Sequence, residues 1–134
     1  GMINNAVHLA KKNFIKAPLH FDFALGAPGS MPGIIKNLLF LAESVPGGST
    51  WSVAGIGKAE MPLSTAAIAM GGHVRVGLED NLFLPDGSLA SNPMLVEKIV
   101  RIAREMGREI ATPGEARSML ALDPSHKDRI LKML

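Results

Sequence analysis

Apolar and polar residues alternate strictly between positions 19 and 25. One side of an extended chain would carry the apolar residues Leu19, Phe21, Phe23 and Leu25, and the other would carry His20, Asp22 and Ala24. Successive side chains of a strand point to opposite faces, so this period predicts a β-strand with one apolar and one polar face. The Gly- and Pro-rich stretch that follows, residues 26–33, predicts a loop.

The rest of the chain repeats this unit with helices between the strands. Strands are expected over 50–56 and 73–78, and helices over 3–16, 34–45, 63–70 and 93–106. Asn92 is the expected N-cap of the last helix, with Pro93 at its first position. Thr112 and Glu115 have the spacing of a capping box that opens a short helix, and Asp123-Pro124 is expected to open another. Residues 107–111 suit a short extended piece.

Strands that alternate with helices predict right-handed βαβ units and a parallel sheet, and therefore the α/β class. Three strands are few for a complete domain of this class, because both faces of a parallel sheet are normally covered and both edges would stay open. No linker divides the chain. The pattern predicts a single partial domain over residues 1–134, part of a larger sheet or barrel.

Composition narrows the class of protein. Hydrophobic residues make up 47% of the 134 residues and charged residues 19%, which predicts a globular chain. The net charge of +2 comes from scattered Lys and Arg, which argues against a nucleic-acid partner. Cysteine is absent, which excludes disulfides and Cys-ligated metals and fits a cytoplasmic location. No apolar run approaches the roughly 20 residues that span a bilayer, so no membrane association is expected.

The third expected strand carries the candidate chemistry. On a strand over 73–78, the side chains of His73, Arg75, Gly77 and Glu79 would share one face. Glu79 and Asp80 would then fall at the carboxyl end of the strand, where barrel enzymes place their active sites. Arg75 and Glu79 could form a simple ion pair. The functional interpretation makes Arg75 an anion clamp and one carboxylate a metal ligand or a base.

Several segments together resemble one enzyme family. They are HVRVGLEDN (73–81), WSVAGIG (51–57), GxxGxMPG (26–33), SNPMLV (91–96) and GREIATPGEAR (107–117). This chain resembles the β-keto acid cleavage enzymes, and the likeness extends from about Pro18 to Leu122. The resemblance implies the C-terminal half of a (β/α)8 TIM barrel with three to four parallel strands and flanking helices. It also implies a zinc-dependent transfer of an acetyl group between a β-keto acid and acetyl-CoA, which yields acetoacetate and a new CoA thioester.

The resemblance implies roles for three residues. Glu79 matches the family's zinc-ligating glutamate, Asp80 matches its catalytic base, and Arg75 matches the arginine that works with that aspartate. The family's other zinc ligands are two histidines in an HxH motif, and no HxH occurs here. A complete barrel needs roughly 250 residues, about twice this length. We therefore expect a homo-oligomer, or a missing N-terminal half that supplies the remaining ligands.

Two other classes of protein compete with this interpretation. A catalytically inactive half-barrel with a binding or structural role would explain the missing HxH motif. An aldolase-type phosphate-handling barrel is disfavoured, because the expected strands contain no Lys for a Schiff base.

Some other residues suit structural roles better than functional ones. His20 and Asp22 are expected to form a structural contact, Trp51 to pack in the core, and His73 to lie at the amino end of its strand. Lys58 and Glu60 fall in a loop at the carboxyl end of the second strand, where substrate contact and exposure to solvent are equally expected.

Overall fold

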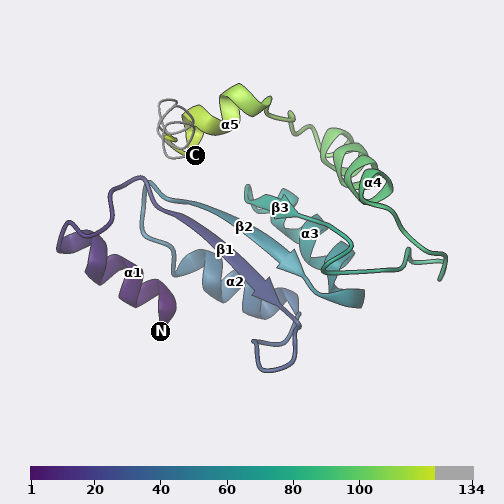
Figure 1. Ribbon diagram of the computed structural model, residues 1–134, viewed down its shortest axis with the longest axis horizontal. Coiled ribbons are helices and arrows are strands. Elements are labelled where there is room, and N and C mark those ends of the chain that lie inside the picture. The colour runs from purple at the N-terminus through teal and green to yellow at the C-terminus, as the bar shows by residue number, and fades with distance from the viewer. Residues whose placement is uncertain (123–134) are drawn as a thin grey trace, which may run out of the picture.

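The computed structural model describes residues 1–122 and has the α/β architecture that the periodicity predicts (Figure 1). Its elements are α1 (Met2–Lys11), β1 (His20–Leu25), α2 (Ile35–Glu43), β2 (Thr50–Gly55), the short 3-10 helix η1 (Gly57–Ala59), α3 (Glu60–Ala69), β3 (His73–Arg75), α4 (Asn92–Glu105) and α5 (Pro113–Met119). The helix expected from Asp123 lies outside the described residues. Within residues 1–122, no helix is long and apolar enough to cross a membrane.

The three strands form one parallel sheet in the order β1-β2-β3. Phe23 pairs in register with Val53, and Val53 with Val74. One residue earlier in each strand, Asp22 pairs with Ser52, and Ser52 with His73. The sequence-based expectation of three parallel strands with flanking helices is therefore confirmed.

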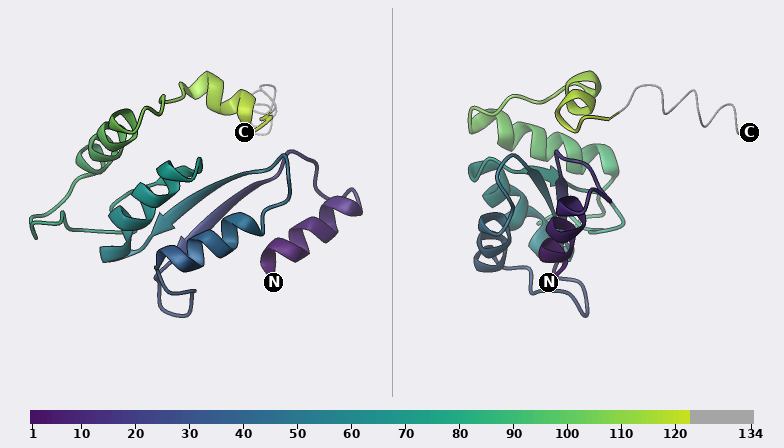
Figure 2. Two further views of the ribbon diagram at one scale, coloured as in Figure 1. Left: turned by 180° about the vertical axis from the view of Figure 1, so that it is seen from behind. Right: turned by 90° about the vertical axis from the view of Figure 1, so that its left-hand side faces the viewer.

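The sheet has one apolar face and one polar face. Helices α2 and α3 cover the apolar face (Figures 1 and 2). The core cluster comprises Phe23, Leu25, Leu38, Val53, Ala59, Leu63 and Ala67. The polar face carries His20, Asp22, Ser52, His73 and Arg75, and most of these side chains are exposed. This division follows from the period-2 pattern of the strands.

Several elements differ in detail from the sequence-based expectation. The first helix ends at Lys11, and Asn13 has a φ of 62°, a left-handed conformation that ends a helix. Helix α3 begins at Glu60, since Pro62 is tolerated in its first turn. Ser91 caps α4 through a hydrogen bond from Met94 N, in place of the expected Asn92. Residues 107–111 form neither helix nor strand.

The third strand is the largest correction. It ends at Arg75, whereas alternation predicted a strand to residue 78. The amides of Asp80 and Asn81 donate to the carbonyl of Gly77 at 3.0 and 3.1 Å, so the chain turns over residues 77–81. Gly77 and Glu79 therefore do not continue the strand face that carries Arg75, and the expectation that they share it is wrong.

Trp51 packs in the core, as expected. Its ring stacks on Phe23, with 5.9 Å between ring centroids, and it belongs to the apolar layer around the core cluster. Gly72 lies directly against the Trp51 ring, and a Cβ atom there would overlap three of its carbons. The turn between α3 and β3 therefore requires a residue without a side chain at position 72.

We predict that Gly72→Ala lowers the free energy of unfolding by about 1–3 kcal/mol, because an added methyl group overpacks the Trp51 site. Gly47→Ala is the matched control, since no atom lies within 4 Å of a Cβ built there. The control should change stability by no more than about 0.5 kcal/mol. Urea denaturation followed by Trp51 fluorescence measures both, and equal stability of the two variants would contradict this packing.

Candidate active site at the carboxyl end of the sheet

Arg75 joins two carboxylates that come from different parts of the sheet. Its Nη2 donates to both oxygens of Asp80 at 3.0 Å, and its Nε donates to Asp80 Oδ2 at 3.1 Å. Its Nη1 donates to Asp22 Oδ2 at 3.3 Å. The guanidinium of β3 therefore bridges β1 and the turn that follows β3. A fork of this kind fixes geometry as well as charge.

The Asp80 end of this bridge is buried and the Asp22 end is open. The Asp80 side chain is 4% exposed, against 37% for Asp22 and 45% for Arg75. Hydrogen bonding to Asp80 is the largest cause that raises the pKa of Arg75. The Arg75–Asp80 pair is thus a fixed ionic unit at the carboxyl end of β3, where parallel-sheet enzymes usually build their sites.

A polar row on the same face leads to this bridge. Ser52 Oγ donates to Asp22 Oδ1 at 2.5 Å, and His20 Nε2 lies 3.2 Å from Ser52 Oγ. His20 Nδ1 lies 2.8 Å from Thr50 Oγ1. The direct His20–Asp22 contact that the sequence suggested is therefore wrong, because Ser52 stands between the two side chains. Burial, followed by the charges of nearby His20 and Arg108, lowers the pKa of His73 on this face.

Glu79 lies apart from the bridge. Its side chain folds back over Gly77, where a Cβ atom would overlap its carboxylate. The residue is exposed. Within residues 1–122, the salt bridges of Arg75 go to Asp22 and Asp80, so the Arg75–Glu79 ion pair is not formed.

The described residues do not fit a zinc site on their own. Among residues 1–122, no group of three or more His, Cys, Asp or Glu side chains could hold a metal ion. Glu79 could offer at most one carboxylate. Structural and catalytic zinc sites take three or four protein ligands, so further ligands would have to come from outside this part of the chain.

Glu60 has a role that the sequence did not reveal. Sequence reasoning placed it in a loop, yet it is fully buried as the first residue of α3. Its Oε2 accepts from Asn81 Nδ2 at 2.9 Å, and its Oε1 accepts from Gly77 N at 3.4 Å. Glu60 therefore ties both ends of the turn that carries Glu79 and Asp80. Lys58, the other residue of this junction, is exposed.

Burial shifts the pKa of the Glu60 carboxyl. Desolvation is the largest effect and raises the pKa of its carboxyl above the ordinary value of 4.5. The folded chain then binds this proton more tightly than the unfolded chain does. The stability that comes from this proton is present below about pH 4.5 and is lost as the pH rises through the folded-state pKa.

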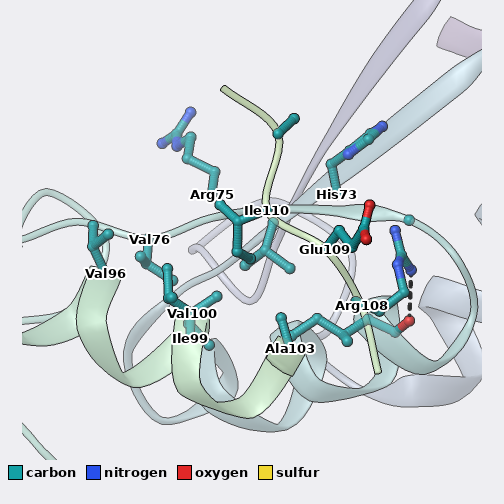
Figure 3. Close-up of a pocket in the computed structure, with 14 residues that line it drawn as sticks. His73, Arg75, Val76, Val96, Ile99, Val100, Ala103, Arg108, Glu109 and Ile110 are labelled. Carbon is teal, nitrogen blue, oxygen red and sulfur yellow. Dashed lines mark hydrogen bonds between the residues drawn. The ribbon is translucent and has the colours of Figure 1, made fainter. Parts of the chain in front are cut away.

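A cavity of about 490 Å³ lies at the outer edge of β3 (Figure 3). Its walls are β3, helix α4 and residues 108–111, and Ile99, Val100 and Ala103 of α4 make its apolar side. In Figure 3, Arg75 and His73 point away from that side. Arg108 closes one end by donating from Nη1 to the carbonyl of Ile68 at 2.8 Å. Residues 108–111 thus lie across a gap from β3.

Comparison with known proteins places this chain in a family. The sequence profile of the beta-keto acid cleavage enzymes matches residues 1–122. The chain belongs to the β-keto acid cleavage enzyme family. It is 53% identical over 123 residues to a 3-keto-5-aminohexanoate cleavage enzyme of Fusobacterium nucleatum. The aligned residues make up 91% of this chain and 44% of that relative.

Two further relatives give the same picture. A 3-keto-5-aminohexanoate cleavage enzyme of Acetoanaerobium sticklandii is 46% identical over 122 residues, which is 90% of this chain and 45% of the relative. A 3-oxoadipate:acetyl-CoA acetyltransferase of Cupriavidus necator is 35% identical over 125 residues, again 90% of this chain and 44% of the relative. The chain therefore spans less than half the length of the curated relatives that it matches.

We predict that Glu60→Ala lowers the free energy of unfolding by about 1–3 kcal/mol at pH 7, because Gly77 N and the Asn81 amide lose a buried acceptor. The amide of Asp80 should also lose protection from hydrogen exchange as the turn loosens. Glu43→Ala, at an exposed helix end, is the control and should stay within about 0.5 kcal/mol of the unmodified chain. Unchanged stability and exchange in Glu60→Ala would show that the turn holds without this carboxylate.

Proposed function

We propose that this chain supplies part of the active site of an acetyl-CoA-dependent β-keto acid cleaving enzyme, and that the rest of the site comes from outside these residues. The observation that carries the proposal is the bidentate Arg75–Asp80 pair, with a buried Asp80 at the carboxyl end of the sheet. Family membership and the printed names of the relatives support acetyl-CoA and a β-keto acid as the reactants.

The proposed chemistry starts with a proton transfer. A β-keto acid is acidic at the carbon between its two carbonyl groups, so a positioned carboxylate can remove a proton from it. Asp80 is the proposed base, and Arg75 is the proposed cation that orients Asp80 and stabilises the negative charge that develops nearby. The bidentate geometry suits this role because it leaves one defined orientation for the Asp80 carboxylate.

Glu79 remains a proposed zinc ligand. It stands in the same turn as Asp80 and its side chain is exposed, so groups from outside the described residues could reach it. Because the described residues contain no metal-binding group of their own, the other ligands would have to come from outside them. The reaction step assigned to Asp80 does not depend on this assignment.

The proposed architecture is the C-terminal half of a (β/α)8 barrel. The parallel order β1-β2-β3, the helices on one face and the polar residues on the other support it. In such a barrel the polar face lines the interior, and the remaining strands cover it. The completing portion is a second copy of this chain or the part of the relatives that has no counterpart here.

One observation favours a second candidate, a half-barrel that is catalytically inactive. Within residues 1–122, the acidic and histidine side chains form no metal-binding group. A chain with a binding or structural role would keep the fold and the Arg75–Asp80 pair without needing zinc. Reconstitution separates the two candidates, because only the first gains activity when the missing portion is added.

The test combines this chain with the portion of the Fusobacterium nucleatum relative that has no counterpart here. We expect the mixture to form a complex and to release acetoacetate from 3-keto-5-aminohexanoate and acetyl-CoA. Asp80→Asn should lower the rate about a hundredfold or more, because the base is lost. Asp86→Asn, in the exposed loop after the site turn, is the matched control and should keep the full rate. A complex without acetoacetate release would favour the inactive half-barrel.

A further inference from the structure

Arg75 reaches across a whole strand to contact Asp22. Arg75 pairs in register with Ala54 of β2, and Ala54 pairs with Ala24 of β1. Neighbouring strands lie about 4.8 Å apart, so the guanidinium must pass over β2 to reach the carboxylate on β1. Ala54 leaves only a methyl group in that path, and it is fully buried. The small side chain at this position makes the cross-strand contact possible.

Asp22 is itself held in place from both sides. Its Oδ1 accepts from Ser52 Oγ, and its Oδ2 accepts from Arg75 Nη1. The Ser52 hydroxyl is buried and also lies within hydrogen-bond distance of His20 Nε2. Since the hydroxyl donates to Asp22, it can accept from the protonated Nε2 of His20. A continuous hydrogen-bonded series therefore runs from His20 through Ser52, Asp22 and Arg75 to Asp80.

Stability alone does not account for this arrangement. The Asp22 and Arg75 side chains are 37% and 45% exposed, and ion pairs at such exposure contribute little to folding. The Asp22 contact adds a further restraint on the plane of the guanidinium, beside the hydrogen bonds to Asp80. With Nη1 held by Asp22, the Nε and Nη2 edge faces Asp80 in one orientation.

We propose that Asp22 is a positioning residue of this active site, and that it acts through Arg75 on Asp80. Ser52 and His20 orient the Asp22 carboxylate, and Asp22 then fixes the rotation of the guanidinium about its Cζ–Nε bond. The inference rests on the proposed function, because Asp80 needs a fixed orientation only if it transfers a proton. A lysine at position 75 could not serve both carboxylates in this way, since it offers a point charge and no planar fork.

The test observes the Arg75 guanidinium directly by nitrogen-15 NMR of the full chain, with Arg75→Lys used to assign its signals. In the unmodified chain we expect two separate Nη signals from a slowly rotating group. Asp22→Asn keeps the size of the side chain but removes its charge, so the contact with Arg75 Nη1 weakens even where the amide oxygen faces Arg75 and the NH2 faces Ser52. We expect rotation about the Cζ–Nε bond to become about threefold to tenfold faster. Asp86→Asn is the matched control and should leave the rotation unchanged.

The indole signal of Trp51, the one tryptophan of the sequence, reports whether each variant is folded. If Asp22→Asn does not fold, Ser52→Ala decides, because it keeps the Asp22 charge and removes its orienting donor. Faster rotation in a folded variant supports the positioning role. Unchanged rotation overturns it, whatever the reconstituted enzyme does. Faster rotation together with no acetoacetate release from the reconstituted complex would overturn the proposed function, and would leave Asp22 with a structural effect on Arg75 but no role in an active site.

Discussion

The bridge that Arg75 makes between Asp22 and Asp80 is the interaction on which the site depends. It joins β1 to the turn after β3 across an intervening strand, so it exists only if all three strands are parallel and in the observed register. It also requires a small residue at Ala54, and a chain that turns back immediately after β3. The contacts of Arg75 therefore depend on the direction and register of all three strands. A register slip of one residue would turn Arg75 to the apolar face, where the cost of burying the charge would be large.

The turn over residues 77–81 depends on the junction between β2 and α3. Helix α3 begins almost directly after β2, because Gly55 lets the backbone of Ala59 and Glu60 approach: a Cβ at Gly55 would lie 2.5 Å from the Ala59 carbonyl oxygen. That close approach brings the Glu60 carboxylate under the turn, where it accepts from Gly77 and Asn81. Asn92 adds a second tie, since its Oδ1 accepts from Leu78 N at 2.9 Å. The buried Glu60 thus supports the turn that carries Glu79 and Asp80.

Local periodicity predicted most of the fold but little of the site's geometry. The alternation in β1 and the helical spacing of α2, α3 and α4 are properties of short segments, so the sequence was sufficient for them. A period-2 strand through residue 78 would have aligned Arg75 with Glu79. The structure pairs Arg75 with Asp80 instead, because the turn at Gly77 interrupts that period. The burial of Glu60 and the cross-strand reach to Asp22 depend on tertiary contacts, which one sequence does not encode in its spacing. The available sequence signal for the Glu60–Asn81 contact was slight. It was a Glu at the start of a helix, followed 21 residues later by an Asn next to Glu79 and Asp80.

The contacts that Arg75 already makes limit the role that it can take in the proposed chemistry. The sequence suggested an anion clamp, which needs a free guanidinium edge for a substrate carboxylate. Here the Nε and Nη2 edge already holds Asp80, and Nη1 already holds Asp22. A substrate carboxylate could take the Nε and Nη2 edge only by displacing Asp80, and a displaced Asp80 would lose its fixed orientation. The geometry therefore favours Arg75 as the residue that orients the base. Binding of the substrate carboxylate would then fall to the remaining N–H donors of Arg75 or to groups from outside the described residues.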